Sequence, residues 1–216
     1  MQSGRIRVFD LDRTLITTNS SYDFCKFLHH HKALSTLTLI QAYWYRLRND
    51  FSSVGLEELH KNVFQCLLKG FSIETLENYA DKFVENSIFS SFYLPVLEEL
   101  KFSQHRGDYT MIMSSSPAFL VRRVAEMLEV DEWVATEYCL DSGNCLIDIK
   151  QFVDGKAKAK TLTTLVEKIG GTLKEVTAYS DSYHDLPLLK LAGEAVAVNP
   201  DAKLLAYSQE KRWRIL

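Results

Sequence analysis

The chain has 216 residues, of which 46% are hydrophobic and 25% are charged, and its formal net charge is −3. This composition suits one large domain, or a domain with an insertion, and argues against long disordered segments. It contains no long basic block, which disfavours nucleic acid as a partner.

The first predicted element is a buried strand over residues 5–9 that ends at Asp10. Asp12 and Thr14 follow at once, so two carboxylates stand at the end of an apolar run. Like charges this close repel each other, and the repulsion grows as water is excluded. A bound cation, a proton held on one carboxyl group, or plain solvent exposure could relieve that repulsion.

Residues 20–89 show helical periodicity, with four apolar stripes. The stripes are Phe24, Phe27, Leu28 and His31; Leu37, Ile40, Trp44 and Leu47; Leu59, Val63 and Leu67; and Leu76, Tyr79, Phe83 and Val84, after a Ser72 cap. They predict a small helical bundle over residues 19–89, inserted between the two parts of a core at 1–18 and 90–216. Tyr43, Trp44 and Tyr45 are interpreted as bundle core.

The most apolar stretch of this bundle, residues 33–45, is too short for a membrane span, so we expect no stable membrane insertion. The first residues do not form a signal peptide. The four cysteines form no C-x-x-C pair, which favours reduced thiols in a cytoplasmic protein. A disulfide between Cys139 and Cys145 stays open, as does the oligomeric state.

From Leu94 onward, predicted strands alternate with predicted helices. Strands are expected at 109–113, 175–180 and 195–198, helices after Pro117 and over 157–169, and a hairpin around residues 142–144. This alternation predicts an α/β fold with a doubly wound, mostly parallel sheet.

Polar residues follow the predicted strands at several points. Ser114 follows 109–113, and Asp181 and Asp185 follow 175–180. The carboxyl ends of the strands in an open α/β sheet share one crevice, so these side chains could meet Asp10 and Asp12. The oxygen-rich pair Asp10 and Asp181 suits a hard cation such as Mg²⁺.

These segments resemble four motifs of the haloacid dehalogenase superfamily, in its phosphoserine-phosphatase-like branch (subfamily IB). The matching segments are DLDRT at 10–14, MSSSP at 113–117, the lysine-bearing start of helix 157–169, and YSDSYHDLPLL at 179–189. The inserted bundle resembles the cap of that branch, and residues 195–216 resemble its C-terminal end. The resemblance implies a Rossmann-like core.

The resemblance also implies a role for each matched residue. Asp10 would attack phosphorus and become an aspartyl phosphate, and Asp12 would act as general acid and then as general base. Ser114 would donate a hydrogen bond to a phosphoryl oxygen. Asp181 would bind Mg²⁺ together with Asp10 and the backbone carbonyl of Asp12. Asp185 would hold metal-bound water or the lysine.

Three further residues are expected around the substrate, namely Thr14, Ser115 and Asn19. Asn19 lies seven residues after Asp12, where phosphoserine phosphatases have a glutamate that meets the substrate amine. For the lysine that screens the phosphoryl charge, Lys158 fits the spacing of this branch best. Lys156 is the alternative.

The sequence therefore predicts a Mg²⁺-dependent phosphomonoester hydrolase that acts on a small phosphorylated metabolite. A phosphatase of lipid phosphates, similar to phosphatidylglycerophosphate, is the alternative, because the cap helix at 34–47 is apolar. A receiver-like phosphoacceptor domain and a catalytically silent binding protein are the rivals from other classes. The cap that follows the first strand argues against a receiver, and the intact acidic residues argue against a silent protein.

Overall fold

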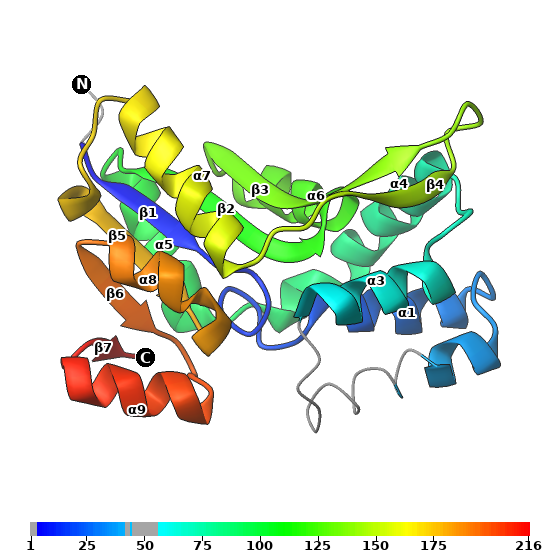
Figure 1. Ribbon diagram of the computed structural model, residues 1–216, viewed down its shortest axis with the longest axis horizontal. Helices are drawn as coiled ribbons and strands as arrows, with labels where there is room; N and C mark the ends of the chain where they lie inside the picture. Colours follow the sequence, from blue (N-terminus) through cyan, green and yellow to red (C-terminus); the bar gives the residue numbers. More distant parts are fainter. Residues whose placement is uncertain (1–3, 42–43, 45–55) are drawn as a thin grey trace.

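A computed structural model describes residues 4–41, 44 and 56–216 of the chain. Its centre is a seven-stranded sheet in the order β4-β3-β2-β1-β5-β6-β7 (Figure 1). The strands are β1 (Ile6–Phe9), β2 (Tyr109–Pro117), β3 (Glu132–Leu140), β4 (Leu146–Gln151), β5 (Val176–Ser180), β6 (Glu194–Ala197) and β7 (Arg214–Ile215). Neighbouring strands are parallel except for the β3–β4 hairpin. The predicted α/β fold with a mostly parallel sheet is therefore confirmed.

Helices cover both faces of the sheet. They are α5 (Leu94–His105), α6 (Ala118–Leu128), α7 (Gly155–Lys168), α8 (Leu186–Leu191) and α9 (Ala202–Lys211), with short helical turns η3 (Leu173–Glu175) and η4 (Tyr183–Asp185). Apolar residues of α7, α8 and α9 form one buried cluster with Val8 and Met111. Residues of α5 and α6 form the other cluster, together with Phe9 and Ile112. Successive residues of β1 and β2 thus face opposite layers, as a doubly wound sheet requires.

The described part of the segment between β1 and α5 folds into helices that lie beyond the carboxyl end of β1 (Figure 1). They are α1 (Ser20–His30), α3 (Leu56–Leu67) and α4 (Ile73–Phe83), followed by the π-helical turn η1 (Val84–Ile88) and η2 (Phe89–Ser91). Residues 36–41 are also helical. The buried side chains of α1, α3 and α4 include Phe24, Leu28, Leu67, Leu76 and Phe83, in agreement with the predicted helical periodicity.

The second predicted stripe is wrong in its orientation. Leu37, Ile40 and Trp44 are 75%, 58% and 66% exposed, so Trp44 is not bundle core. Leu34 is buried instead, and Leu39 packs against the core. Both faces of this segment carry leucines, and periodicity alone selected the outer one. Tyr43, Tyr45 and Leu47 lie outside the described residues.

The β3–β4 hairpin reaches out from the sheet to the inserted helices (Figure 1). The backbone N–H of Gly70 donates to the carbonyl of Leu146 (2.8 Å), the N–H of Leu146 to that of Phe71 (2.9 Å), and the N–H of Ile73 to that of Asn144 (2.9 Å). The sequence predicted the hairpin but not this pairing. Within the described part of the chain no disulfide joins the cysteines, so Cys139 and Cys145 are not bridged.

Among the described residues, no helix combines the length and the apolar character that a membrane crossing needs.

Candidate active site

Asp10 stands at the carboxyl end of the central strand β1. Its N–H donates to the carbonyl of Tyr179 at 3.0 Å, so pairing with β5 continues one residue past β1. The Asp10 residue is only 6% exposed. A carboxylate buried at this position needs charged or polar partners, since its hydration is lost.

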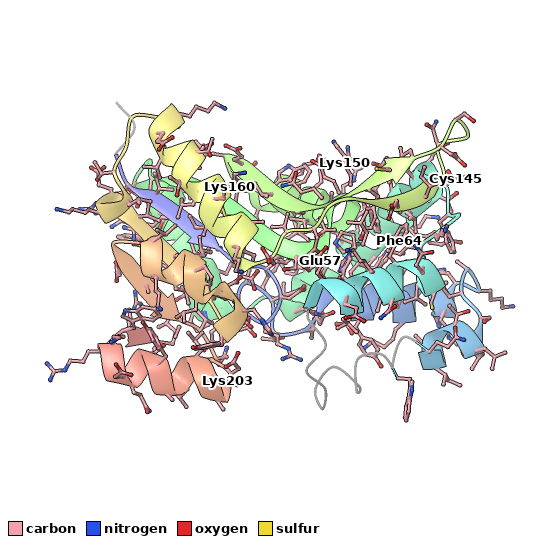
Figure 2. The ribbon with its side chains drawn as sticks, viewed as in Figure 1. Glu57, Phe64, Cys145, Lys150, Lys160 and Lys203 are labelled. Carbon is pink, nitrogen blue, oxygen red and sulfur yellow. The ribbon has the colours of Figure 1, made fainter. Side chains whose placement is uncertain are left out.

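Lys158 supplies that partner. Its Nζ lies 2.7 Å from Oδ1 of Asp10 and 2.7 Å from Oδ2 of Asp185, and the lysine is 2% exposed. The hydroxyl of Ser180 also donates to Oδ2 of Asp185, at 2.8 Å. Lys156 and Lys160 are exposed, and Figure 2 shows Lys160 on α7. Of the candidate lysines, the structure thus brings Lys158 to Asp10.

The start of α7 is built to place Lys158 beside Asp185. Asp154 caps the helix, because its Oδ1 accepts the N–H of Ala157 at 2.8 Å. A Cβ at Gly155 would lie 2.0 Å from the carbonyl oxygen of His184, so only glycine allows this close approach. α7 is thereby pressed onto the turn that carries Asp185.

The electrostatics of the site are those of an acidic cluster with too little positive charge. Burial raises the pKa of Asp10 well above its ordinary value, against the lowering effect of Lys158. Burial also raises the pKa of Asp181 to about 7, with the Arg13 charge opposing it. For Lys158, burial acts to lower the pKa, but the charges of Asp10 and Asp185 outweigh it and the net direction is upward. The lysine therefore stays protonated.

Asp12 is held by one hydrogen bond to each carboxyl oxygen. The N–H of Ser20, at the start of α1, donates to Oδ1 at 2.6 Å. The hydroxyl of Ser116, in β2, donates to Oδ2 at 2.5 Å. Ser116 is not among the site residues that the sequence predicts. Strand alternation contained a signal, because residues i and i+2 share a face and Ser114 was already a candidate.

The other predicted serine and threonine residues differ in their surroundings. Ser114 is 1% exposed, and its Oγ accepts the N–H of Ser116 at 3.1 Å. Ser115 donates its hydroxyl to the carbonyl of Val153 at 2.7 Å, which engages it outside the acidic cluster. Oγ1 of Thr14 is buried and has no hydrogen-bond partner within the described part of the chain. A buried hydroxyl of this kind has bonding capacity to offer a ligand.

Asn19 is the N-cap of α1. Its Oδ1 accepts the N–H of Tyr22 at 2.9 Å. The next residue, Ser20, contacts Asp12, so Asn19 lies beside the site. One lone pair of its Oδ1 is used in capping the helix. Asn19 therefore has a structural role, whether or not it also meets a substrate.

The donor set fits Mg²⁺. Asp10 and Asp181 are both buried and present hard carboxylate oxygens, and Lys158 is the one lysine that the described residues bring into the cluster. Asp185 is already bonded to Lys158 and Ser180. Among the described residues, no three His, Cys, Asp or Glu side chains form a group that could hold a metal. The carboxylates of Asp10 and Asp181, with the backbone carbonyl of Asp12 that the sequence predicts as a ligand, would suit an ion that keeps several waters, as Mg²⁺ does.

Comparison with known proteins agrees with this geometry. A family model described as haloacid dehalogenase-like hydrolase matches residues 8–190. A histidinol-phosphatase of Neisseria meningitidis is 28% identical over 98% of this chain and 97% of its own. Phosphoserine phosphatase SerB1 of Mycobacterium tuberculosis is 26% identical over 96% of this chain and 68% of its own.

Solved structures share the fold over nearly the whole chain. A protein of unknown function from Bordetella pertussis superposes with a TM-score of 0.86 at 21% identity, and 99% of each chain is covered. A substrate-bound phosphoserine phosphatase gives a TM-score of 0.75 at 17% identity, covering 100% of this chain and 94% of that one. The family model spans most of the chain, and the relatives include phosphatases that match almost all of it. The chain belongs to the haloacid dehalogenase-like hydrolases, in their phosphoserine-phosphatase-like branch, and is a phosphatase of that type.

Proposed function

We propose that this phosphatase is Mg²⁺-dependent, works through an aspartyl phosphate on Asp10, and acts on small phosphomonoesters. The observation that carries the proposal is the buried contact of Asp10 with Lys158, 2.7 Å long, at the carboxyl end of the central strand. The lysine is fixed by Asp185 at the same distance. An anionic nucleophile can approach an anionic phosphoryl group only where positive charge offsets the repulsion.

In the first step, an Oδ atom of Asp10 forms a bond to phosphorus and the ester P–O bond breaks. The departing alkoxide takes a proton from the carboxyl group of Asp12. Lys158 and the hydroxyl of Ser114 stabilise the negative charge on the phosphoryl oxygens during the transfer. Thr14 supports the loop that carries both aspartates, because its backbone N–H donates to the carbonyl of Leu11 at 3.3 Å.

In the second step, Asp12 is a carboxylate and accepts a proton from a water molecule. The water oxygen bonds to phosphorus, the bond from phosphorus to Asp10 breaks, and phosphate is released with Asp10 restored. Asp12 donates a proton in the first step and accepts one in the second, so the same residue serves as acid and then as base.

Asp10 and Asp181, with the backbone carbonyl of Asp12, would hold Mg²⁺, and Asp185 would hold Lys158 or a metal-bound water. When bound, the ion supplies positive charge to the phosphoryl oxygens. Its charge would also offset the burial that raises the pKa of Asp10 and Asp181.

Residues 19–89 act as a cap over a core made of 1–18 and 90–216. Two linkers join the parts and run side by side, since the N–H of Thr17 donates to the carbonyl of Ser91 (2.7 Å) and that of Tyr93 to Leu15 (2.9 Å). Asp10 is 6% exposed, and the inserted helices lie beyond the carboxyl end of β1, where Asp10 stands (Figure 1). The cap therefore keeps water from the transfer step and contacts the leaving group.

The named relatives and the uncharged Asn19 support a small phosphomonoester as the substrate. The relatives include a histidinol-phosphatase and a phosphoserine phosphatase, whose named substrates are small phosphomonoesters. Asn19 is uncharged, so it offers no carboxylate to a substrate amine. A panel of purified phosphomonoesters with and without an amine, assayed with Mg²⁺ and with chelator, tests the proposal. Turnover that persists in excess chelator, or that survives in Asp10→Asn, would contradict it.

A lipid phosphate is the second candidate, favoured by one observation. Leu37, Ile40 and Trp44 expose apolar side chains at helical spacing on the cap. An exposed apolar stripe of this kind can contact acyl chains or a lipid surface. Including a lysophospholipid phosphate and a diacyl phosphatidylglycerophosphate in the same panel separates this candidate from the first.

A further inference from the structure

The hydroxyl of Ser116 lies at the centre of a small buried network. It donates to Oδ2 of Asp12 at 2.5 Å. The hydroxyl of Ser20 lies 3.1 Å from it and that of Ser21 lies 2.8 Å from it. Ser116 is 4% exposed and Ser20 is 1% exposed, so water has little access to these bonds. Two elements far apart in sequence, β2 and the start of α1, thus meet at one carboxyl group.

The hydrogen-bond capacity of a hydroxyl gives this network a direction. A serine hydroxyl has one hydrogen and two lone pairs. If its hydrogen goes to Asp12, both lone pairs of Ser116 remain for the hydroxyls of Ser20 and Ser21. Every hydrogen then points along the network toward the carboxylate, and Ser116 has no unsatisfied group.

The second oxygen of Asp12 is fixed independently. Oδ1 accepts the N–H of Ser20 at 2.6 Å, from the opposite end of the carboxyl group to Ser116. Each carboxylate oxygen has about two lone-pair directions, so one direction on each stays open. The orientation of the Asp12 carboxyl group is therefore fixed. An open lone-pair direction remains through which the group can pass a proton to or from a reacting oxygen.

We propose that Ser116 is the positioning residue for general acid–base catalysis by Asp12. The proposal rests on the role given to Asp12 above. Without the Ser116 hydroxyl, the bond to Ser20 alone would let the carboxyl group rotate, and the open lone pair would no longer be held toward the leaving oxygen. The contrasting possibility is that Ser116 only ties α1 to β2.

Leaving-group dependence separates these two roles. Benzyl, phenyl and 4-nitrophenyl phosphate are similar in size, but their leaving alcohols become steadily more acidic. Protonation by Asp12 therefore matters most for benzyl phosphate and least for 4-nitrophenyl phosphate. The quantity to compare is kcat/KM, because it reports on events up to the departure of the alcohol and excludes the later water step.

We expect Ser116→Ala to lower kcat/KM for benzyl phosphate by about 10- to 100-fold, the range for losing a hydrogen bond to a charged group. The loss should shrink to about threefold or less for 4-nitrophenyl phosphate. Ser116→Thr keeps the hydroxyl and should restore most of the benzyl phosphate activity. Ser21→Ala is the matched control, because it removes a neighbour of Ser116 and leaves the bond to Asp12 in place. It should show no graded loss.

Asp12→Asn, measured on the same three esters, separates failure of this proposal from failure of the proposed function. A graded loss in Asp12→Asn with an equal loss for all three esters in Ser116→Ala would overturn the positioning role alone. A folded Ser116→Thr variant that is as slow as the alanine variant would do the same. If Asp12→Asn shows no loss on any ester, the acid–base role of Asp12 fails, and the role of Ser116 fails with it.

Discussion

The cluster at the carboxyl end of β1 and the inserted helices contrast in what they bury. In the cluster, Asp10, Lys158 and Asp185 are charged and nearly inaccessible, and each contacts an opposite charge. On the second inserted helix, Leu37 and Ile40 are apolar and mostly exposed. Buried charge is costly unless it is paired, so the core residues are constrained by chemistry. The exposed residues of that helix are constrained less by folding, because their side chains remain in water.

The largest effect is expected at Asp10. Asp10→Asn removes the nucleophile but keeps an oxygen that can accept a hydrogen bond from Lys158. Turnover of 4-nitrophenyl phosphate should fall by about 10⁴-fold or more, because an amide is a far weaker nucleophile. The melting temperature should confirm a folded protein. Activity near the wild-type level would show that Asp10 is not the nucleophile. It would also show that the buried charged cluster is not the site of the chemistry.

Lys158→Met tests whether the buried charges depend on one another. It should lower kcat by about 10²- to 10³-fold, as losing a preorganised charge donor does. It should also cost stability by about 3–5 kcal/mol at neutral pH, because Asp10 and Asp185 lose their partner. Lys160→Met is the matched control on the exposed side of α7, and it should change neither quantity. Equal effects of the two changes, followed by urea unfolding and steady-state kinetics, would contradict the assignment of the lysine.

The acidic cluster also predicts how stability depends on pH. Burial raises the pKa of Asp181 from its ordinary 3.8 to about 7, and that of Asp10 moves in the same direction. Between about pH 4 and pH 7 the folded protein therefore holds protons that the unfolded chain has released, so stability without metal should fall as the pH rises. The pKa of Lys158 is raised from 10.5, so its contribution is constant in this window.

Mg²⁺ should reverse that trend. The ion competes with protons for Asp10 and Asp181, so it should raise the melting temperature more at pH 8 than at pH 5. Ca²⁺ should replace it poorly in activity, because it prefers more ligands and looser geometry. Thermal melts with Mg²⁺ and with chelator at the two pH values measure the stabilisation. Steady-state assays with Ca²⁺ in place of Mg²⁺ measure the activity. Metal-free stability that increases between pH 4 and pH 7 would contradict the proposed cluster.

Part of the site was predictable from the sequence because chemistry leaves a local pattern. Asp10 and Asp181 directly follow apolar strands, and the spacing of Lys158 agreed with its observed contact. Ser116 was missed because a serine beside other serines resembles a helix cap, and its partner Asp12 is 104 positions away in sequence. Only the fold brings those two together.

The fold was predictable to a similar depth. Strand and helix periodicity predicted β1, β2, β5 and β6, the β3–β4 hairpin and most inserted helices, but not β7. The wrong face was chosen for the second inserted helix because leucines occur on both sides of it: Leu37 is exposed and Leu39 packs against the core. Pairing of residues 70–73 with the hairpin was not predicted, since backbone hydrogen bonds between distant loops leave no side-chain pattern.

A smaller effect is expected at the boundary between the two regions. Asn19→Glu should shift the ratio of kcat/KM for an aminated and a matched unaminated phosphomonoester toward the aminated one, by about 3- to 10-fold. The added carboxylate attracts an ammonium group. Asn19 caps α1, so Asn19→Asp is the control that adds charge and keeps the cap. An unchanged ratio in both folded variants would place Asn19 outside the substrate pocket.

The smallest effect should come from the exposed stripe. Leu37→Ser should change the free energy of unfolding by no more than about 0.5 kcal/mol, because the side chain is 75% exposed. Leu28→Ala, on the buried face of α1, should cost about 2–5 kcal/mol. Urea unfolding of both variants measures the pair. A large loss in Leu37→Ser would mean that the stripe is covered in solution. Activity on a lysophospholipid phosphate in the same variant tests the lipid candidate.

The central claim is that Asp10 carries the phosphoryl group during turnover. The direct measurement is a rapid acid quench during steady-state turnover of a ³²P-labelled phosphomonoester with Mg²⁺, in which protein-bound ³²P reports the acyl phosphate. A parallel quenched sample is reduced with tritiated borohydride, which expels the phosphate and leaves tritium on the residue, and is then analysed by peptide mapping. Reduction converts an aspartyl phosphate to homoserine and so marks its position. We predict homoserine at position 10, dependent on Mg²⁺ and absent in Asp10→Asn. Label on another residue, or turnover with no acyl phosphate trapped at Asp10, would contradict the account.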